Sequence, residues 1–441
     1  MKLSVIIVSY NVSHFLEQCL KSVVKASHSL NVDIIVVDNC SEDDSVNMIR
    51  NRFPEVKLIV NSDNKGFSKA NNQAIRQSDS DYILLLNPDT VLEESALKRT
   101  LGFMETHPDA GGLGIKMIDG QGSFLPESKR GLPTPWASFC KMSHLAQLFP
   151  HSAFFNRYHA GHLPENDTNK IEVLAGAFML LRRKVLDEIG LLDEDFFMYG
   201  EDIDLSFRIT KAGYLNYYFP QAWMIHYKGE STRKSSLNYV RLFYGAMLIF
   251  ARKHFAGKNE RLLSLVILPG VYFRASIAMI YSLLNSLTQS SSWSFISVTF
   301  KKSLPSLLKI KRTANHTVKQ HVALIIANHT EATLIGELVR QTTPVEVLTI
   351  DISVNHKDLG HIYSSETLEK IDLFYNITEK IKQIHPDEII FSASDLTTDN
   401  IIILMCQLKK HAIPYRIAHT DIHTIIGANS VRILQTSNVV A

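Results

Sequence analysis

The chain has few cysteines, and no two of them are spaced as in a metal site or a redox motif. Cys19, Cys40, Cys140 and Cys406 lie far apart in 441 residues. Disulfide-rich domains are short and dense in cysteine, and structural zinc sites use CxxC-type pairs. We therefore expect neither a disulfide framework nor a zinc site, and a reducing compartment fits this cysteine usage.

The sequence also shows no strong charge imbalance, and we do not expect its first residues to form a signal peptide. The formal net charge is only +2, which does not indicate a nucleic-acid-binding protein. The apolar run after Met1 is too short for a secretory signal peptide, and no small-residue cleavage site follows it. We expect a protein of the cytoplasm or of the cytoplasmic face of the bacterial inner membrane.

The first 110 residues alternate apolar runs with stretches of helical periodicity. A chain of this length should form two or three domains, and 45% hydrophobic with 20% charged residues is an ordinary globular composition. Continuous apolar strands separated by helices predict an α/β domain with a parallel sheet covered by helices. Strands are predicted at 3–10, 32–38, 56–61 and 82–87, and helices at 12–27, 43–53 and 68–77.

The same alternation returns near the C-terminus. Residues 119–170 predict loops over the first sheet, and a second structured block follows from 171 to 227. A small Rossmann-like α/β domain is predicted at 318–441, with strands at 322–328, 345–352, 388–393 and 414–419. The glycine-rich turn of dinucleotide sites is absent after its first strand, where the chain reads ANHTEATLIGE, so no bound cofactor is expected.

The remaining segment, 256–317, is apolar in part and basic at its ends. Residues 262–287 are long enough to span a bilayer, but Pro269-Gly270 interrupts them and Arg274 would cost about 2.5–3.5 kcal/mol near the centre. Residues 252–312 hold ten Lys or Arg and one acid. We predict a membrane-associating helix pair on an anionic leaflet. A buried soluble bundle and a single span remain as alternatives.

Acidic and metal-binding residue types end several elements of the first domain. Asp38 ends one strand and Asp89 follows another, in LLLNPDT; Glu201-Asp202 precede a helix, and His226 follows an apolar run. Because the carboxyl ends of parallel strands meet at one edge of a sheet, these residues are expected to converge on one site. Each has a structural alternative as well: a turn or helix cap for Asp89, a charged helix start for Asp202 and a hydrogen-bonded histidine for His226.

The same residue types suit metal and acid–base chemistry. A carboxylate at a strand end, joined by a histidine from another strand, makes an open site for Mg²⁺ or Mn²⁺ and phosphate oxygens. Adjacent acids in a cleft can divide their roles, one orienting and one accepting a proton from a hydroxyl. The spacing alone does not choose between these roles and the structural alternatives.

Taken together the motifs resemble family 2 glycosyltransferases, which are inverting enzymes with the GT-A fold, and within them the rhamnosyltransferase-like branch. The resemblance covers about 1–255. It rests on the order of VIIVSYN, IIVVDNCSEDDS, NKGFSKANN, LLLNPDT, LAGAFMLLRRKVLDEIGLLDEDFFMYGEDIDLSFR and HYKGES. The long run is the most specific of these motifs.

The resemblance implies roles for a first group of residues, those around the donor. Ser9 and Asp38 would contact the base and ribose of a nucleotide-sugar, and Asn64 and Gly66 would approach the nucleotide. Asn87 stands where many relatives carry the first aspartate of their metal motif, which removes one charge from the site.

A second group would carry the metal and the chemistry. The resemblance implies that Asp89 and His226 bind a divalent cation, and that Asp202 is the catalytic base with Glu201 beside it. Gly176 would let the backbone approach the sugar or the acceptor. The implied reaction moves rhamnose or a hexose from a nucleotide-diphosphate donor to a hydroxyl of a polyprenyl-linked saccharide acceptor, with inversion, during cell-surface polysaccharide synthesis at the membrane surface.

Two other functions were weighed. A catalytically silent nucleotide-sugar-binding scaffold in a polysaccharide assembly complex is favoured by Asn87 and opposed by the presence of Asp89, Asp202 and His226. A nucleotidyltransferase would need a glycine-rich, Lys/Arg-bearing loop after the first strand, and SYNVSHFLEQ has none. The C-terminal domain resembles the CoA-binding-like domain found beside polyprenyl sugar-phosphate transferases, and a regulatory or assembly role is expected for it.

Overall fold

The structure is a computed structural model that describes residues 1–227, 237–255, 276, 321–342, 345–352, 377–428 and 430–433. The chain divides into two compact units, one made of residues 1–231 with 321–441 and the other of residues 232–320. The predicted domain limits at 255 and 317 fall at or between described stretches and stay predictions.

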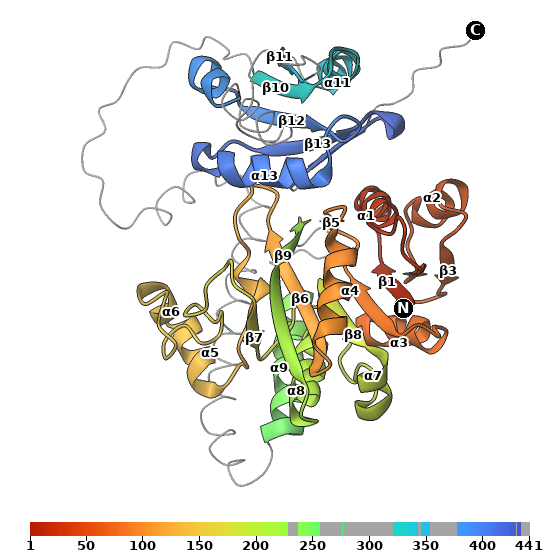
Figure 1. Ribbon diagram of the computed structural model, residues 1–441, viewed down its shortest axis with the longest axis vertical. Coiled ribbons are helices and arrows are strands. Elements are labelled where there is room, and N and C mark those ends of the chain that lie inside the picture. The colour runs from red at the N-terminus through yellow and green to blue at the C-terminus, as the bar shows by residue number, and fades with distance from the viewer. Residues whose placement is uncertain are drawn as a thin grey trace. The chain divides into compact units, whose positions relative to one another are not determined.

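The first unit holds a nine-stranded mixed sheet in the N-terminal part of the chain (Figure 1). Its order is β3-β2-β1-β4-β8-β6-β9-β5, with β7 paired to β9. The strands β3, β2, β1 and β4 are parallel, as the sequence predicts, while β8 is antiparallel to both β4 and β6. The strands are β1 (Leu3–Ser9), β2 (Val32–Asp38), β3 (Lys57–Val60), β4 (Tyr82–Leu86), β5 (Thr90–Leu92), β6 (Ala110–Ile118), β7 (Asn169–Ile171), β8 (Phe178–Arg182) and β9 (Leu215–His226).

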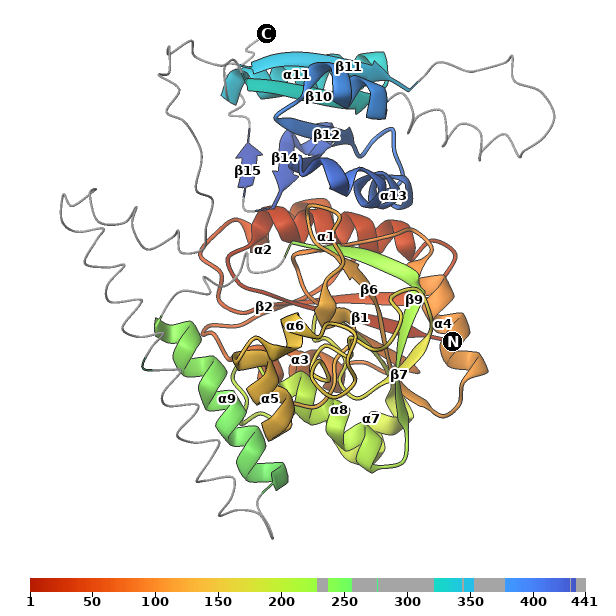
Figure 2. The same cartoon turned by 90° about the vertical axis from the view of Figure 1, so that its left-hand side faces the viewer.

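Helices cover both faces of this sheet because side chains alternate along each central strand. In β1, Leu3, Val5 and Ile7 pack on one side, and Ile6 and Val8 pack on the other. Figure 2 shows α1 and α2 on one side of the strands and α3 on the other. The first layer contains α1 (Ser13–Ala26), α2 (Ser45–Arg52) and α4 (Ala96–Thr106), and the second α3 (Phe67–Arg76), α7 (Arg183–Ile189) and α8 (Glu201–Lys211).

The stretch 119–170 contains more regular structure than the predicted loops. It includes a 3-10 turn at Pro126–Ser128, α5 (Pro135–Met142) and α6 (Leu145–Leu148). The Thr134 side chain caps α5 by accepting from the Ala137 N–H at 3.3 Å, and Pro135 fills the first helical position. The prediction missed α5 because it has few residues and no long apolar periodicity.

The C-terminal part of the first unit forms a separate six-stranded sheet. Its order is β11-β10-β12-β13-β14-β15. The strands β11, β10, β12 and β13 are parallel, and β14 is antiparallel to both of its neighbours, β13 and β15. All four predicted strands are present. The elements are β10 (His321–Ala327), α11 (His329–Thr342), β11 (Val345–Asp351), β12 (Glu388–Ser392), α13 (Thr398–Leu408), β13 (Tyr415–His419), β14 (Thr424–Gly427) and β15 (Ser430–Ile433).

The second unit contains α9 (Leu237–Phe255). Within the described parts of the chain, none of the helices combines the length and apolarity that crossing a bilayer requires. The predicted membrane-associating segment, 262–287, lies outside the described residues except for Ser276.

Candidate functional site

Two buried polar side chains mark the carboxyl edge of the parallel strands. Ser9 ends β1 opposite Asp38 at the end of β2, and their side chains are 0% and 1% exposed. Asp38 accepts a hydrogen bond from the Ser41 N–H through Oδ2 at 2.9 Å. Its Oδ1 and the Ser9 Oγ have no hydrogen-bond partner among the described residues. Buried polar atoms are nearly always paired, so this pair indicates a place for a ligand's hydroxyl or amide groups.

The loop after β3 is fixed beside Asp38 by Asn39. The Asn39 amide donates to Asn64 Oδ1 at 2.9 Å and to the Gly66 carbonyl at 3.4 Å. Asn64 Oδ1 also accepts from the Gly66 N–H at 3.0 Å. The predicted nucleotide-binding residues Asn64 and Gly66 therefore lie next to Asp38. Asn39 was missed because an asparagine after a strand reads as an ordinary turn residue.

Gly66 is required where it stands. Its φ is +81°, and a Cβ added to it would lie 2.5 Å from the Phe197 carbonyl oxygen. The Phe197 carbonyl also accepts from the Phe67 N–H at 2.7 Å. The loop that holds Gly66 is thus in contact with the segment that leads into Glu201 and Asp202 on α8.

Asp89 and His226 meet as the sequence predicts. Asp89 lies in the tight turn between β4 and β5, and Thr90 pairs with His226 across β5 and β9. The distance between Asp89 Oδ1 and His226 Nε2 is 3.3 Å, with both side chains largely buried. Ser95, and not Asp89, precedes the first residue of α4, so Asp89 does not cap that helix.

The pair offers one oxygen and one nitrogen donor to a cation. In the described residues no group of three or more His, Cys, Asp or Glu side chains gathers to hold a metal. Two protein donors suit an open coordination site whose remaining ligands are waters and substrate phosphates, which is how Mg²⁺ and Mn²⁺ bind at phosphoryl groups. The residues present therefore fit such a cation.

A single backbone segment, 176–177, connects the Asp89 turn to Asp202. The Asn87 N–H donates to the Ala177 carbonyl at 3.1 Å. The Gly176 N–H donates to Asp202 Oδ2 at 3.3 Å, and a Cβ on Gly176 would lie 3.6 Å from the Asp202 Cβ. Gly176 therefore lies against the Asp202 carboxylate, in the first turn of α8.

Arg130 is a site residue that the sequence did not reveal. Its guanidinium forms an ion pair with Asp202 Oδ2 and donates to the Leu174 carbonyl at 2.5 Å. The side chains of Arg130 and Asp202 are 11% and 13% exposed. The Arg130 backbone bridges to Val173, which fixes the arginine over the start of the 174–177 segment. A lone arginine in a Pro/Gly-containing stretch carries no periodic signal, so only the fold brings the two residues together.

Glu201 differs from its neighbour in its electrostatic environment. It is buried, and its Oε2 has no partner among the described residues. Burial, and next the charge of Asp202, hold the pKa of the Glu201 carboxyl well above its usual range. The two adjacent acids therefore differ in their surroundings: the Glu201 carboxyl favours its protonated form, whereas the Asp202 carboxylate is paired with a guanidinium.

Residues 4–190 match the model of glycosyl transferase family 2. The N-acetylglucosaminyl-diphospho-decaprenol L-rhamnosyltransferase of Mycobacterium tuberculosis is 29% identical over 266 residues, which cover 58% of this chain and 85% of that protein. Rhamnosyltransferase WbbL of Escherichia coli is 29% identical over 178 residues, covering 38% and 63%.

Among solved structures, the mannosyltransferase PcManGT from Pyrobaculum calidifontis, in complex with GDP-Man and Mn²⁺, is similar with a TM-score of 0.40. It is 15% identical, and the match covers 66% of this chain and 76% of that one. The family match spans β1 to α7, and the Mycobacterium tuberculosis relative extends the similarity over 266 residues. Residues 4–190 are therefore a glycosyl transferase family 2 domain, with rhamnosyltransferases among its curated homologues.

Proposed function

We propose that the chain is an inverting glycosyltransferase that moves rhamnose or a hexose from a nucleotide-diphosphate donor to a hydroxyl of a lipid-linked saccharide. The observation that carries the proposal is the 176–177 segment. It hydrogen-bonds the Asp202 carboxylate on one side and the Asn87–Asp89 turn on the other. This segment thereby links the proposed proton acceptor on α8 to the turn that carries Asp89, which pairs with His226.

The donor nucleotide is assigned to the carboxyl edge of β1 and β2. Ser9 Oγ and Asp38 Oδ1, buried without partners among the described residues, would hydrogen-bond its base and ribose. Asn39 holds Asn64 and Gly66 against this place. A glycine there lets the backbone approach the nucleotide closely.

Asp202 is assigned the role of base. Its carboxylate takes the proton of the acceptor hydroxyl as that oxygen forms the new bond to the anomeric carbon. In the same step the bond from the anomeric carbon to the diphosphate oxygen breaks, and the nucleoside diphosphate leaves. Attack opposite the leaving group inverts the configuration. The ion pair with Arg130 holds the Asp202 carboxylate in a fixed orientation.

A divalent cation is part of the proposal. Asp89 and His226 would hold it, and when bound it neutralises charge on the diphosphate leaving group. Glu201, favoured in its protonated form, can donate a hydrogen bond near the same segment without adding a second negative charge beside Asp202.

The name of one relative supports the proposed acceptor class. The Mycobacterium tuberculosis protein is named for transfer to N-acetylglucosaminyl-diphospho-decaprenol, a saccharide on a polyprenyl diphosphate. An acceptor of this kind requires access to a membrane surface. A place at the cytoplasmic face, in polysaccharide synthesis of the cell envelope, is consistent with that chemistry.

The test is turnover with a panel of sugar nucleotides that includes dTDP-rhamnose and the UDP-hexoses. Membrane lipid extract supplies the acceptor, and parallel reactions contain EDTA. We expect release of nucleoside diphosphate with one donor, dependence on added lipid and loss of turnover on chelation. Turnover that needs no lipid would contradict the acceptor class, and full activity in EDTA would contradict the cation.

A silent nucleotide-sugar-binding scaffold is the second candidate. Asn87 in place of an acid and the Arg130 ion pair on Asp202 are the observations that favour it. Nucleotide-sugar binding without turnover, for every donor and in the presence of lipid extract and Mn²⁺, would identify the scaffold instead.

A further inference from the structure

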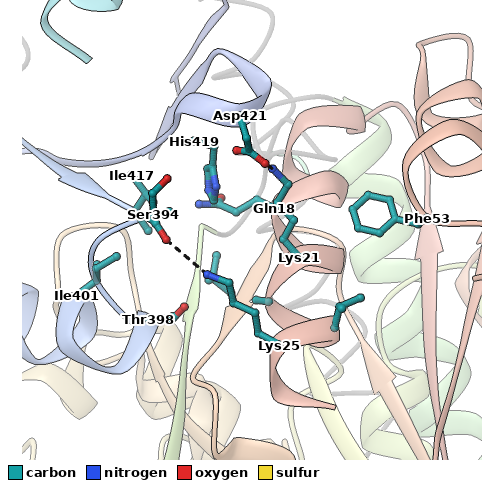
Figure 3. A pocket seen from close by; sticks show the side chains of 14 residues that line it. Gln18, Lys21, Lys25, Phe53, Ser394, Thr398, Ile401, Ile417, His419 and Asp421 are labelled. Carbon is teal, nitrogen blue, oxygen red and sulfur yellow. Dashed lines mark hydrogen bonds and ion pairs between the residues drawn. The ribbon is translucent and has the colours of Figure 1, made fainter. Parts of the chain in front are cut away.

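A pocket lies at the carboxyl edge of the second parallel sheet, within the first compact unit (Figure 3). Its volume is about 450 Å³, in the range of small-molecule sites. Ala393 and Ser394 follow β12 there, and His419 ends β13. In doubly wound sheets ligands bind outside the carboxyl ends of the strands. The N-terminal residue Thr398 of α13 completes this wall.

Helix α1 supplies the opposite wall. Gln18, Lys21, Ser22 and Lys25 recur at helical spacing, so they share one face. Lys21 forms an ion pair with Asp421, whereas the one partner of Lys25 among the described residues is the Ala393 carbonyl, at a long 3.4 Å. The two lysines and one aspartate are the ionised side chains of the lining, which leaves it with a surplus of one positive charge.

Two side chains in the pocket are buried without hydrogen-bond partners. Gln18 is 1% exposed, and neither its Nε2 nor its Oε1 is paired among the described residues. His419 is 8% exposed, and its Nε2 is unpaired in the same sense. Figure 3 shows the Gln18 amide directed from α1 toward the His419 ring. Leaving such atoms unpaired costs about 1–3 kcal/mol each, so a ligand that pairs them would bind favourably.

The His419 ring is held neutral in this place. Burial, and next the charge of Lys21, lower the pKa of the imidazole to about 3. A neutral ring offers one donor and one acceptor nitrogen, and the Gln18 amide offers both kinds of group as well. Together they match a polar ring edge, such as that of a nucleobase, better than a second anionic group.

The rest of the lining is apolar. Val24, Phe53, Val91, Ile401 and Ile417 surround the polar groups. An inorganic ion would leave these side chains uncovered, whereas a ligand with a planar body would cover them. The lysines of the lining can bind a phosphate group through their charge, and its serine and threonine hydroxyls can donate hydrogen bonds to it. Lys25 lies at the exposed rim of the pocket.

We propose that this pocket binds a small phosphate ester of the size of a nucleoside monophosphate. The phosphate lies by Lys25 and Lys21, and the ring edge is hydrogen-bonded by Gln18 and His419. This site is distinct from the donor site at Ser9 and Asp38, and the proposal does not depend on glycosyl transfer. It gives the C-terminal sheet a ligand although its first loop lacks the glycines of a dinucleotide site.

The test is calorimetric titration of the full chain carrying Asp38→Ala, which weakens the donor site. The probes are UMP, TMP and AMP, with inorganic phosphate and uridine as partial ligands. We expect one equivalent of a monophosphate to bind and Lys25→Met to weaken it at least tenfold. Lys98→Met, at an exposed lysine on α4, is the matched control and should leave binding unchanged.

Gln18→Leu separates binding from folding. Because the Gln18 amide is unpaired, a leucine of similar size should leave the melting temperature unchanged or raise it, while binding falls at least tenfold. Three results would overturn the proposal: no probe binds, inorganic phosphate binds as tightly as the monophosphates, or Lys25→Met and Gln18→Leu bind like Lys98→Met. Loss of glycosyl transfer with binding retained would count against the proposed function alone.

Discussion

Arg130 and Asp202 form the most consequential contact at the scale of single residues. The pair is largely buried, and Arg130 also donates to the Leu174 carbonyl. A buried ion pair contributes little net stability, but removing one partner leaves the other charge uncompensated. The Asp202 carboxylate is thus held between the Arg130 guanidinium and the Gly176 N–H.

Arg130→Met should therefore destabilise the fold by about 3 kcal/mol, because Asp202 loses its counter-charge. The double variant Arg130→Met/Asp202→Asn should recover part of that loss, since neither partner is then charged and unpaired. Urea unfolding of the wild type, both single variants and the double variant measures the coupling. Strictly additive effects would show that the two residues do not interact.

Gly66 is the second residue whose replacement should have a large effect on stability. Gly66→Ala places a Cβ at a backbone conformation that only glycine adopts readily, and 2.5 Å from the Phe197 carbonyl oxygen. We expect a loss of at least about 2 kcal/mol in unfolding free energy and weaker donor binding.

Gly102→Ala is the matched control for this change. Gly102 lies inside α4 with nothing within 4 Å of an added Cβ, so alanine there should stabilise by about 0.5–1 kcal/mol. Chemical denaturation measures both variants. Equal effects of the two substitutions on the free energy of unfolding would contradict the claim that position 66 requires a glycine.

At the scale of elements, β5, β9 and α13 meet around a buried acid. Glu93 follows β5 and is 0% exposed, and its Oε2 accepts from the Trp223 indole of β9 at 3.1 Å. The same indole N–H donates to Asp399 of α13 at 3.1 Å. Burial is the main cause that raises the pKa of the Glu93 carboxyl, to about 7. The charge of Arg99 opposes this increase, and Asp399 adds to it.

A raised carboxyl pKa makes stability depend on pH in a defined direction. The stability that neutral Glu93 contributes is fully present below pH 4.5, which is the pKa of this carboxyl in the unfolded chain. It is lost as the pH rises through about 7, the pKa in the folded protein. The change is on the order of 3 kcal/mol. Glu93→Gln should remove this slope, whereas Glu55→Gln at an exposed position should keep it.

The measurement is urea unfolding at pH values from 4.5 to 8, compared as the difference between wild type and variant. The difference is needed because acids with lowered pKa values, such as Asp33 and Glu194, act in the opposite direction. An unchanged slope in Glu93→Gln would mean that Glu93 is ionised in the folded protein.

The elements also show what local sequence can predict. Apolar runs and helical periodicity gave β1 to β4 and α1 to α3, because those signals belong to each segment alone. The antiparallel insertion of β8 between β4 and β6 depends on pairing between distant segments, and no periodicity encodes it. The edge strand β3 has no buried residue: Lys57 and Val60 are exposed and Leu58 and Ile59 half-buried, unlike the continuous buried run that its sequence suggests.

At the scale of the whole molecule, the sequence again predicts what its motifs carry and misses contacts between distant segments. Asp89 and His226, and Gly176 and Asp202, were each placed in the site from motif order, and the fold brings each pair together. Arg130 contacts Asp202 from 72 positions away in the sequence. Gln18 and His419 line one pocket from opposite ends of the chain. Such contacts follow from topology and leave no trace in local patterns.

The central claim is that Asp202 is the base of a glycosyl transfer. The most direct measurement is single-turnover release of nucleoside diphosphate by wild type, Asp202→Asn and Asp187→Asn, with donor and lipid acceptor saturating. Asp187 is a surface carboxylate paired with Arg183, and its replacement should change nothing. Thermal melting and donor titration establish that each variant folds and binds.

We expect Asp202→Asn to release nucleoside diphosphate about 100- to 10,000-fold more slowly than wild type, with donor affinity retained. Release by Asp202→Asn at the wild-type rate would contradict the assignment of this carboxylate.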